Sequence, residues 1–332
     1  RRSSDLMENS TLTQSLRRSA DTLDGVSLSR RQTSDSFVAS KAERKYKKKT
    51  QKVGAGMELH YQKETPEIQA QLQETMKKEW SNWERYSDGK WITQADLDRL
   101  RQENPNLKII PTRWVHTNKA EPNQPMKLKS RLVARGDLED SSTMRCDSPT
   151  ASQTAMGLVF TLSATRDTDL HCGDISAAFL QGSTLDRILV LSVPKNEGIP
   201  GVETEGMYYL VSSTAYGTKD APRGWFKNLD STVKKETFKP LAHEPAAYVL
   251  HHEDGSLAGL MVVHVDDLLW TGGPYIEEKM KVIQEKYNFG KVSVNKFTYC
   301  GRDVVKDSAG VHISCPSLMD RVRPIFLTPD EK

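Results

Sequence analysis

Three segments of the chain repeat apolar residues at the spacing of one face of an α-helix. The spacing is three or four positions, so the side chains follow one side of the helix and can pack on a core. The residues are Leu72, Met76, Trp80 and Trp83 in the first segment; Ala151, Ala155, Leu158, Val159 and Leu162 in the second; and Trp225, Leu229 and Val233 in the third. Serine and threonine at the start of the second segment, and Asp220 with Pro222 before the third, are typical of helix N-termini. The pattern therefore predicts one helix for each segment.

Runs of strand-forming residues lie between these helices. "KIIPTRWVHTNK" and "KLKSRLVARGD" predict two strands, and the polar, proline-containing "AEPNQPM" between them predicts a hairpin loop. Residues 188–193 and 207–211 predict two further strands. In "LHCGDISAAFLQG", Leu170, Cys172 and Ile175 indicate a buried strand that turns into a short helix or turn. The order of strands and helices, with acids near strand ends, indicates an α+β fold.

The second strand of the predicted hairpin carries cations on one face. Lys127, Lys129 and Arg131 alternate with other residues, and Leu128 and Leu132 occupy the opposite positions. Such a row is either a solvated face that keeps the protein soluble or a site that binds phosphate. The strand alone does not decide between them.

An apolar run later in the chain contains two adjacent acids. "LAGLMVVHVDDLLWTGG" has Asp266 and Asp267 in its middle, where burying unpaired carboxylates costs several kcal/mol. Successive residues of a straight strand point to opposite faces, so we expect a β-hairpin turn at the pair. In that turn both carboxylates can meet Asp174, another acid in an apolar context. The alternative is an ordinary exposed hairpin tip, where Asp is common.

Three converging carboxylates would need a cation. Hard oxygen ligands favour Mg²⁺ or Mn²⁺, and two such ions roughly 3.5–4 Å apart stabilise the attacking and leaving oxygens of phosphoryl transfer. We therefore treat Asp174, Asp266 and Asp267 as candidate metal ligands and catalytic residues.

Composition narrows the class of protein without identifying it. The chain has 332 residues, 36% hydrophobic and 27% charged, so it can bury a substantial core. Its formal charge of +3 is too small to indicate what kind of partner the protein binds. The four cysteines form no C-x-x-C motif, which fits a reducing intracellular compartment, and no apolar stretch approaches the length of a membrane span. The start "RRSSDLMENS" has no initiator Met, and we expect a fragment or a processed piece.

Residues 1–55 differ from the rest of the chain. They are rich in Ser, Thr, Arg and Lys and end in the basic run "KAERKYKKKTQK". A segment with so few large apolar residues cannot offset its ordering entropy, so we predict a disordered basic tail. The basic run is either a nuclear or nucleic-acid signal or only a solvated tail.

Several motifs resemble one family of enzymes. "KSRLVARG", "CDSPTAS", "DISAAFLQG", "YGTKDAPRGW", "HVDDLL" and "TYCGRDVVKDSAGVHIS" occur in the order and at the spacings of the reverse transcriptase of copia-type LTR retrotransposons. The resemblance covers residues 70–325. It implies a right-hand polymerase fold with fingers and palm, an antiparallel palm sheet with packed helices, and RNA- or DNA-templated DNA synthesis with two Mg²⁺ ions.

The resemblance also implies roles for single residues. Asp174 matches the first catalytic aspartate, and Asp266 with Asp267 matches the Tyr-Val-Asp-Asp pair. Phe179 matches the aromatic residue beneath the incoming sugar, which excludes a 2′-hydroxyl. Lys129 and Arg131 match the fingers cations that hold the triphosphate. The stretch Asp220-Ala221-Pro222-Arg223, with Trp225, matches a motif on the nucleotide and template side.

Three positions depart from the family pattern. His264 replaces the usual Tyr, Thr218 the usual Leu and Asp220 the usual Gln. None of them removes a metal ligand, but they put nucleotide or template contacts in doubt. Two hypotheses therefore stand: a catalytic polymerase segment of a retrotransposon polyprotein, and an inactive relic or domesticated nucleic-acid-binding module.

The resemblance divides the chain and names its partners. We expect a tail at 1–55, a fingers-like region at 56–165, a palm at 166–315 and the start of a truncated connection or thumb at 316–332. The implied partners are an RNA or DNA template-primer, dNTPs and other polyprotein segments (integrase, RNase H) absent from this chain, with no membrane. The expected location is cytoplasmic particles or the nucleus.

Overall fold

The structure is a computed structural model that describes residues 58–120, 124–140, 142, 144–319 and 322. The predicted tail at 1–55 and most of 316–332 lie outside the described residues. The helices are α3 (Pro66–Tyr86), α4 (Gln94–Glu103), α5 (Gln153–Arg166), α6 (Ala221–Lys235), α7 (Pro274–Lys286) and α8 (Pro316–Met319), with short 3₁₀ turns η1 (Tyr61–Lys63), η2 (Gly136–Leu138) and η3 (Ala178–Gln181). Helices and antiparallel sheets together confirm the predicted α+β class.

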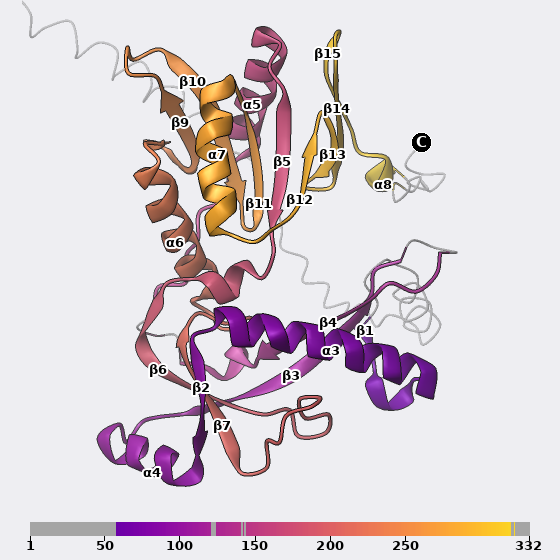
Figure 1. Ribbon diagram of the computed structural model, residues 1–332, viewed down its shortest axis with the longest axis vertical. Helices are drawn as coiled ribbons and strands as arrows, with labels where there is room; N and C mark the ends of the chain where they lie inside the picture. Colours follow the sequence, from indigo (N-terminus) through magenta and orange to yellow (C-terminus); the bar gives the residue numbers. More distant parts are fainter. Residues whose placement is uncertain (1–57, 121–123, 141, 143, 320–321, 323–332) are drawn as a thin grey trace, which may run out of the picture. The chain divides into compact units, whose positions relative to one another are not determined.

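The first sheet is built around one long strand. Its strands are β1 (Glu58–Leu59), β2 (Gly89–Thr93), β3 (Ile109–Asn118), β4 (Leu128–Ala134), β6 (Thr184–Ser192) and β7 (Met207–Ser213). Strand β3 pairs antiparallel with β4, as the predicted hairpin requires. The first residues of β3 also pair with β6, and this pairing is parallel. The helix α3 packs along β4 (Figure 1). Its predicted stripe, from Leu72 to Trp83, is buried.

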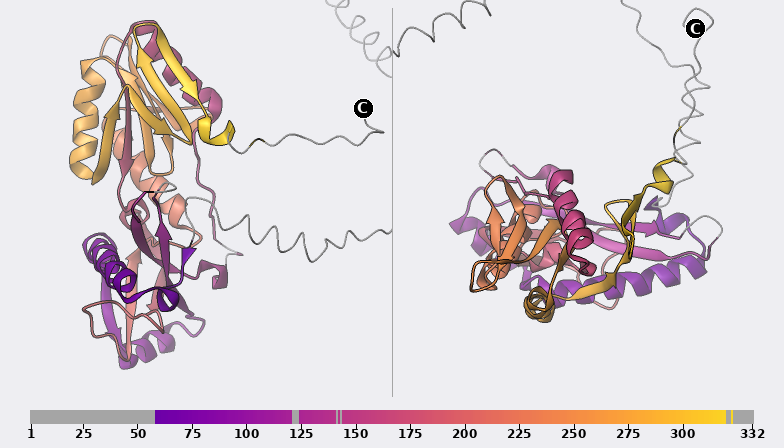
Figure 2. Two further views of the ribbon diagram at one scale, coloured as in Figure 1. Left: turned by 90° about the vertical axis from the view of Figure 1, so that its right-hand side faces the viewer. Right: turned by 90° about the horizontal axis from the view of Figure 1, so that it is seen from above.

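The second sheet carries the two acidic segments. Its strands, in spatial order, are β12 (Phe289–Val294), β5 (Leu170–Ile175), β11 (Asp267–Gly272), β10 (Leu257–His264), β9 (Glu244–His251) and β8 (Lys239–Leu241), and every neighbouring pair is antiparallel. Helices α5 and α7 cover opposite faces of this sheet (Figure 2). Strands β5 and β11, which carry the acids, therefore lie in the interior of a packed sheet.

The expected boundary at residue 165 does not separate the two sheets. Strands β6 and β7 fall within the range assigned to the palm, yet they pair with β3 and β2 in the first sheet. After β5 the chain crosses into the first sheet and then returns through α6, because the edges of β3 and β2 offer hydrogen-bonding partners to β6 and β7.

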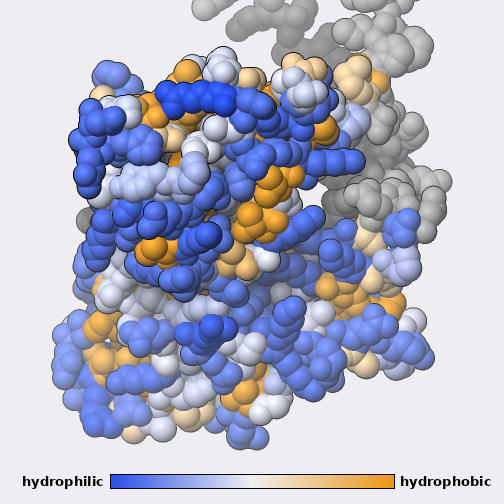
Figure 3. All heavy atoms as spheres, turned by 45° about the horizontal axis from the view of Figure 1, so that its top comes forward, coloured by the Kyte–Doolittle hydropathy of each residue, from blue (hydrophilic) through white to orange (hydrophobic). Residues whose placement is uncertain are grey.

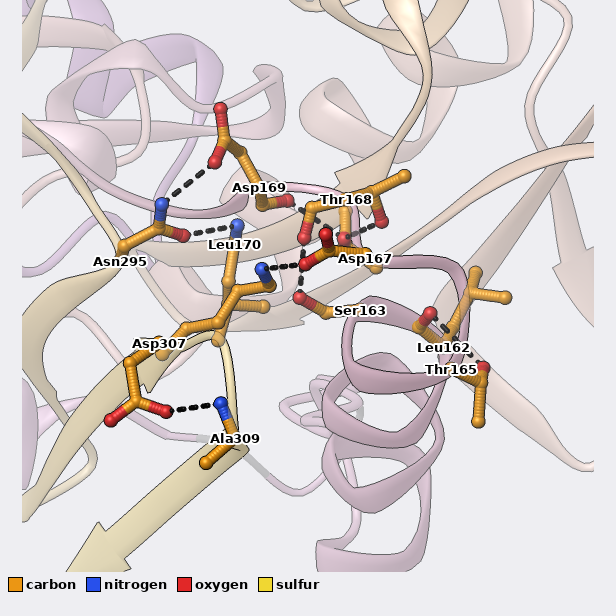
Figure 4. A network of polar contacts seen from close by, with 12 residues as sticks. Leu162, Ser163, Thr165, Asp167, Thr168, Asp169, Leu170, Asn295, Asp307 and Ala309 are labelled. Atoms are coloured by element: carbon orange, nitrogen blue, oxygen red, sulfur yellow. Dashed lines mark hydrogen bonds and ion pairs between the residues drawn. The ribbon is translucent and has the colours of Figure 1, made fainter.

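A polar network fixes the start of β5 (Figure 4). The Leu170 amide donates to Asn295 Oδ1 at 2.9 Å, and the Asn295 amide donates to the Leu170 carbonyl at 2.8 Å. Asn295 Nδ2 also reaches Asp169 Oδ1 at 2.7 Å, and Ser163 Oγ donates to the Thr168 carbonyl at 2.7 Å. Because a slip of one residue would turn every side chain of a strand to the other face, this network also decides where Asp174 points.

A third, three-stranded sheet follows. It consists of β13 (Lys296–Tyr299), β14 (Arg302–Asp307) and β15 (Gly310–Ser314), in which both neighbouring pairs are antiparallel. Figure 3 shows a mainly hydrophilic face with scattered hydrophobic patches. Among the described helices, none combines the length and the apolar character that crossing a bilayer requires.

Two helix predictions need correction. In α5, Leu158 is 48% exposed, because the buried face is formed by Ala155, Met156, Val159 and Phe160 instead. Ser152 caps this helix by accepting a hydrogen bond from the Ala155 amide, as expected of the Ser- and Thr-containing start. Asp220 occupies the N-cap position of α6, but its carboxylate makes no cap hydrogen bond. It pairs with Arg187 Nε at 3.0 Å, since an ion pair with a half-buried guanidinium competes successfully with the backbone amides.

Candidate active site

The hairpin turn that carries the adjacent acids is short and strained. His264 at the end of β10 pairs with Asp267 at the start of β11, so the turn consists of Val265 and Asp266. Val265 has φ of +61°, a left-handed conformation that a β-branched residue rarely adopts. Asp266 therefore lies in the turn, as predicted, whereas Asp267 is the first residue of the strand. A strained residue of this kind persists only where its surroundings hold it.

Two hydrogen bonds from other elements hold the turn. The indole N–H of Trp225 in α6 donates to the Val265 carbonyl at 2.7 Å, and the Ile175 amide donates to the Asp266 carbonyl at 2.9 Å. Trp225 is buried, and its ring meets that of Tyr287 edge to face with centroids 5.2 Å apart. Trp225 belongs to the apolar stripe predicted to pack on a core, and the structure buries it there.

The acids of β5 and the turn come together although 91 residues lie between Asp174 and Asp266 in the sequence. Asp174 lies directly opposite Asp267 in the β5–β11 register, which puts both side chains on one face of the sheet. Asp174 and Asp266 also line the same cavity, of about 440 Å³. Burial, and then repulsion from Asp266, raise the pKa of Asp174 above its ordinary value. The arrangement thus accumulates negative charge that a cation would stabilise.

The same cavity is also lined by basic residues. Its charged lining consists of Lys78, Lys119, Lys127, Lys129 and Arg131 together with Glu79, Asp174 and Asp266. Burial, and then repulsion from Arg131 and Lys119, lower the pKa of Lys129. Neither Lys129 nor Arg131 forms an ion pair within the part of the chain that the structure describes. These two cations are therefore available to an anion that enters the cavity.

Asp267 has a different environment from its neighbour. It does not line the cavity, and burial, followed by repulsion from Asp266 and Asp174, raises its pKa to about 6. Across the described ranges, no three His, Cys, Asp or Glu side chains are grouped closely enough to hold a metal ion. The donor chemistry nevertheless fits a hard divalent cation, since Asp174 and Asp266 supply carboxylate oxygens to one cavity in which they repel each other.

Two predicted substrate residues lie elsewhere. Phe179 in η3 packs partly buried against the core of the second sheet and does not line the cavity. Its ring meets the ring of Tyr216, with centroids 5.9 Å apart. Arg223 lines a separate cavity of about 350 Å³ and pairs with Asp147 at 2.9 Å. The structure therefore brings Lys129 and Arg131 to Asp174 and Asp266, but not Phe179 or Arg223.

Several cavity residues were missed in the sequence, Glu79 and Tyr216 among them. Glu79 in α3 is 6% exposed, and its Oε1 has no hydrogen-bond partner among the described residues. Burial raises its pKa, against the attraction of Arg131 and Lys129. Tyr216, in the loop after β7, also lines the cavity. The only signal for Glu79 was its place beside the apolar stripe of its helix. Tyr216 is the first residue of the motif "YGTKDAPRGW", but the resemblance assigned it no role.

Two positions that depart from the family pattern, Thr218 and His264, differ in their surroundings. Thr218 donates its hydroxyl to the Ala215 carbonyl at 3.0 Å, within the loop that carries Tyr216. The Nδ1 atom of His264 is buried and, among the described residues, has no hydrogen-bond partner. Neither residue lines the cavity.

Comparisons with known proteins identify similar chains. Residues 98–328 match the family model described as "Reverse transcriptase (RNA-dependent DNA polymerase)". The chain is 27% identical over 195 residues to the Retrovirus-related Pol polyprotein from transposon TNT 1-94 of Nicotiana tabacum, covering 54% of this chain and 14% of that protein. It is 24% identical over 218 residues to the corresponding polyprotein from transposon RE2 of Arabidopsis thaliana, covering 63% and 14%. This chain thus spans only a small part of each relative.

Solved structures give a looser likeness. The foamy viral protease-reverse transcriptase in complex with double-stranded DNA aligns with a TM-score of 0.36 and 13% identity, covering 71% of this chain and 34% of that one. The same viral protein in complex with an RNA/DNA hybrid aligns with a TM-score of 0.34 and 12% identity, covering 70% and 29%.

Proposed function

Because the chain belongs to the reverse transcriptase (RNA-dependent DNA polymerase) family, we propose that it is the polymerase segment of a copia-type retrotransposon polyprotein. It adds nucleotides from dNTPs to the 3′-hydroxyl of a primer on an RNA or DNA template. One observation carries this proposal: Asp174 and Asp266 share a cavity with Lys129 and Arg131, and both cations lack ion pairs among the described residues. Carboxylates facing unpaired cations match the charge distribution of a metal-bound triphosphate.

The cations and the carboxylates of the cavity have separate tasks in the proposed reaction. Arg131 offers a planar fork of donors and Lys129 a point charge, so both bind the phosphates and orient the nucleotide. Asp174 and Asp266, with Asp267 beside them, would hold two Mg²⁺ or Mn²⁺ ions, which stabilise the attacking and leaving oxygens when bound. The hydrogen bonds at Val265 and Asp266 keep the turn in place, so that Asp266 stays in the cavity that Asp174 also lines.

The finer assignments belong to the same proposal. The first sheet with α3 forms the fingers, and the second sheet forms the palm. Phe179 selects against a 2′-hydroxyl, and Arg223, at a distance from the carboxylates, contacts the template side. Integrase and RNase H segments of the polyprotein are further partners, and the protein works in cytoplasmic particles or the nucleus.

Primer extension on RNA and DNA templates, with and without Mg²⁺, tests the proposal. We expect metal-dependent extension by the wild-type protein and none by Asp174→Asn or Asp266→Asn. Asp254→Asn is the matched control, because Asp254 lies in the exposed β9–β10 loop of the same sheet and accepts a hydrogen bond from the Ser256 amide. Extension by the Asp266→Asn variant would contradict the proposed site. Nucleic-acid binding by a wild-type protein that extends no primer would favour the non-catalytic alternative.

A further inference from the structure

Tyr216 is fixed beside the cationic strand by its backbone. Its carbonyl accepts a hydrogen bond of 2.7 Å from the amide of Ala134, the last residue of β4. The next residue, Gly217, has φ of +86°, and a Cβ atom there would lie 2.2 Å from the Ala134 carbonyl oxygen. Only glycine permits this approach, so the loop after β7 is held against the end of β4.

The ring of Tyr216 has a different partner on each of two sides. The Arg131 guanidinium carbon lies 5.5 Å from the ring centroid, within the range of a cation–π contact. The ring of Phe179 meets it at an interplanar angle of 70°, with centroids 5.9 Å apart, which is an edge-to-face contact. Arg131 comes from β4 and Phe179 from η3, so Tyr216 connects two residues that do not otherwise share an element.

Tyr216 stays neutral in the cavity. Burial, and then the nearby Glu79, raise the pKa of Tyr216 above its ordinary value, and this outweighs the opposite effect of Arg131. The phenol therefore stays protonated, and it remains a hydrogen-bond donor in a cavity lined by both cations and carboxylates. A neutral ring also keeps the negative face that attracts a guanidinium.

We propose that Tyr216 is a positioning residue that sets nucleotide specificity, because it holds Arg131 for the phosphates and Phe179 for the sugar in one fixed relation. The inference rests on the proposed polymerase function. Phe179 contacts Tyr216, which lines the cavity, so the Tyr216 ring links the position of Phe179 to the cavity. Phosphate binding and sugar selection are therefore coupled in this protein.

The test compares variants that keep or remove the aromatic face. Tyr216→Phe retains the ring and loses the hydroxyl, whereas Tyr216→Leu loses the ring. Tyr275→Leu is the matched control, because Tyr275 at the start of α7 also has a cation over its ring, Lys279 at 5.8 Å, but lies outside the cavity. The measurements are kcat and KM for dNTPs and for rNTPs in primer extension, together with the thermal midpoint and equilibrium binding of a dNTP.

For Tyr216→Leu we expect a KM for dNTP raised about tenfold, the effect of losing a partly desolvated cation–π contact. We also expect a higher ratio of rNTP to dNTP use and a smaller change in kcat. Tyr275→Leu should retain the wild-type KM and the wild-type ratio. Tyr216→Phe, which keeps the ring, should change both less than Tyr216→Leu does. Arg131→Ala should raise KM less in the Tyr216→Leu background than in the wild type, because the two residues act together.

Several outcomes would overturn the role of Tyr216. Wild-type extension with an unchanged KM and sugar ratio in Tyr216→Leu contradicts it and leaves the polymerase proposal intact. Fully additive effects of Arg131→Ala and Tyr216→Leu contradict it as well. If Tyr216→Leu lowers the thermal midpoint strongly, Tyr216→Met takes its place. The same two quantities are then compared with the wild type: the KM for dNTP and the ratio of rNTP to dNTP use. A wild-type protein that neither extends primers nor binds a dNTP contradicts both proposals.

Discussion

The indole N–H of Trp225 donates a hydrogen bond of 2.7 Å to the carbonyl oxygen of Val265, the residue that precedes Asp266. The donor comes from the core and the acceptor from a strained turn at the cavity. Because Val265 has φ of +61°, the turn needs an external restraint, and this bond supplies one. A core residue thus controls the position of a proposed metal ligand.

Trp225→Phe removes this N–H and keeps an aromatic ring. The Val265 carbonyl then loses its partner, and we expect a loss of about 1–3 kcal/mol in the free energy of unfolding. The kcat of primer extension should fall more than tenfold, on the order of what misplacement of a reacting group costs. Trp80→Phe is the control, since the buried Nε1 of Trp80 has no hydrogen-bond partner among the described residues. An equal effect on kcat in both variants would show that only packing matters.

Divalent cations should stabilise the wild-type protein. Binding relieves the repulsion between Asp174 and Asp266, so the thermal midpoint in Mn²⁺ should exceed that in EDTA, corresponding to about 1–3 kcal/mol at saturating metal. In EDTA, Asp174→Asn should melt above the wild type, because it removes one of two repelling charges. In Mn²⁺ this advantage should disappear. A variant that responds to Mn²⁺ as the wild type does would exclude Asp174 as a ligand.

Glu79 should make stability depend on pH. Its pKa is raised in the folded protein above the ordinary value of 4.5, so the protonated form favours folding. This contribution is complete below the unfolded-state pKa and is lost as the pH rises through the folded-state pKa. Glu79→Gln should therefore be more stable than the wild type at pH 8, by about 1 kcal/mol, and equal to it near pH 4.

Chemical denaturation at several pH values measures this difference. Glu74→Gln is the control, because Glu74 lies on the same helix with its side chain 72% exposed and pairs with Lys77. A constant difference between Glu79→Gln and the wild type from pH 4 to pH 8 would mean that Glu79 does not titrate as its burial requires.

Phe179→Ala should relax sugar selection. If Phe179 supports the ring of Tyr216 under the incoming sugar, the alanine variant should use rNTPs more readily and keep most of its activity with dNTPs. Phe179 is only partly buried, so the loss of stability should stay below the roughly 3–5 kcal/mol of a fully buried Phe. Competition between a dNTP and its rNTP in primer extension measures the ratio. Lost stability with an unchanged ratio would make Phe179 a core residue only.

Arg131→Ala should raise the KM for dNTP and leave folding nearly unchanged. Among the described residues Arg131 has no ion pair to lose, and its side chain is exposed to the cavity. The increase should be at least tenfold, as expected when a charge-assisted hydrogen bond to phosphate is lost. Arg101→Ala, on the exposed face of α4, controls for the loss of a positive charge. An unchanged KM would indicate that Arg131 and Lys129 belong only to a solvated face and do not bind phosphate.

The sequence by itself determined the elements whose signals are local. The stripe from Leu72 to Trp83 has the period of a helix, and the structure buries it in α3. Two apolar runs around Asp266 and Asp267 required a turn, because a straight strand would send adjacent carboxylates to opposite faces. The antiparallel pairing of β10 with β11 confirms this turn. The order of the motifs was sufficient to predict the family, because motifs are recognised from residue identity and spacing alone.

Only the tertiary structure decided which of these residues share a cavity. Asp174 meets Asp266 because β5 is inserted between β11 and β12, a strand order that no local pattern specifies. The register at Asn295 and the bond from Trp225 then set which side chains point into the cavity. Packing also brought Glu79 and Tyr216 into the lining of the cavity and put the ring of Phe179 against that of Tyr216. These contacts join segments that are distant in sequence, so no local pattern predicts them.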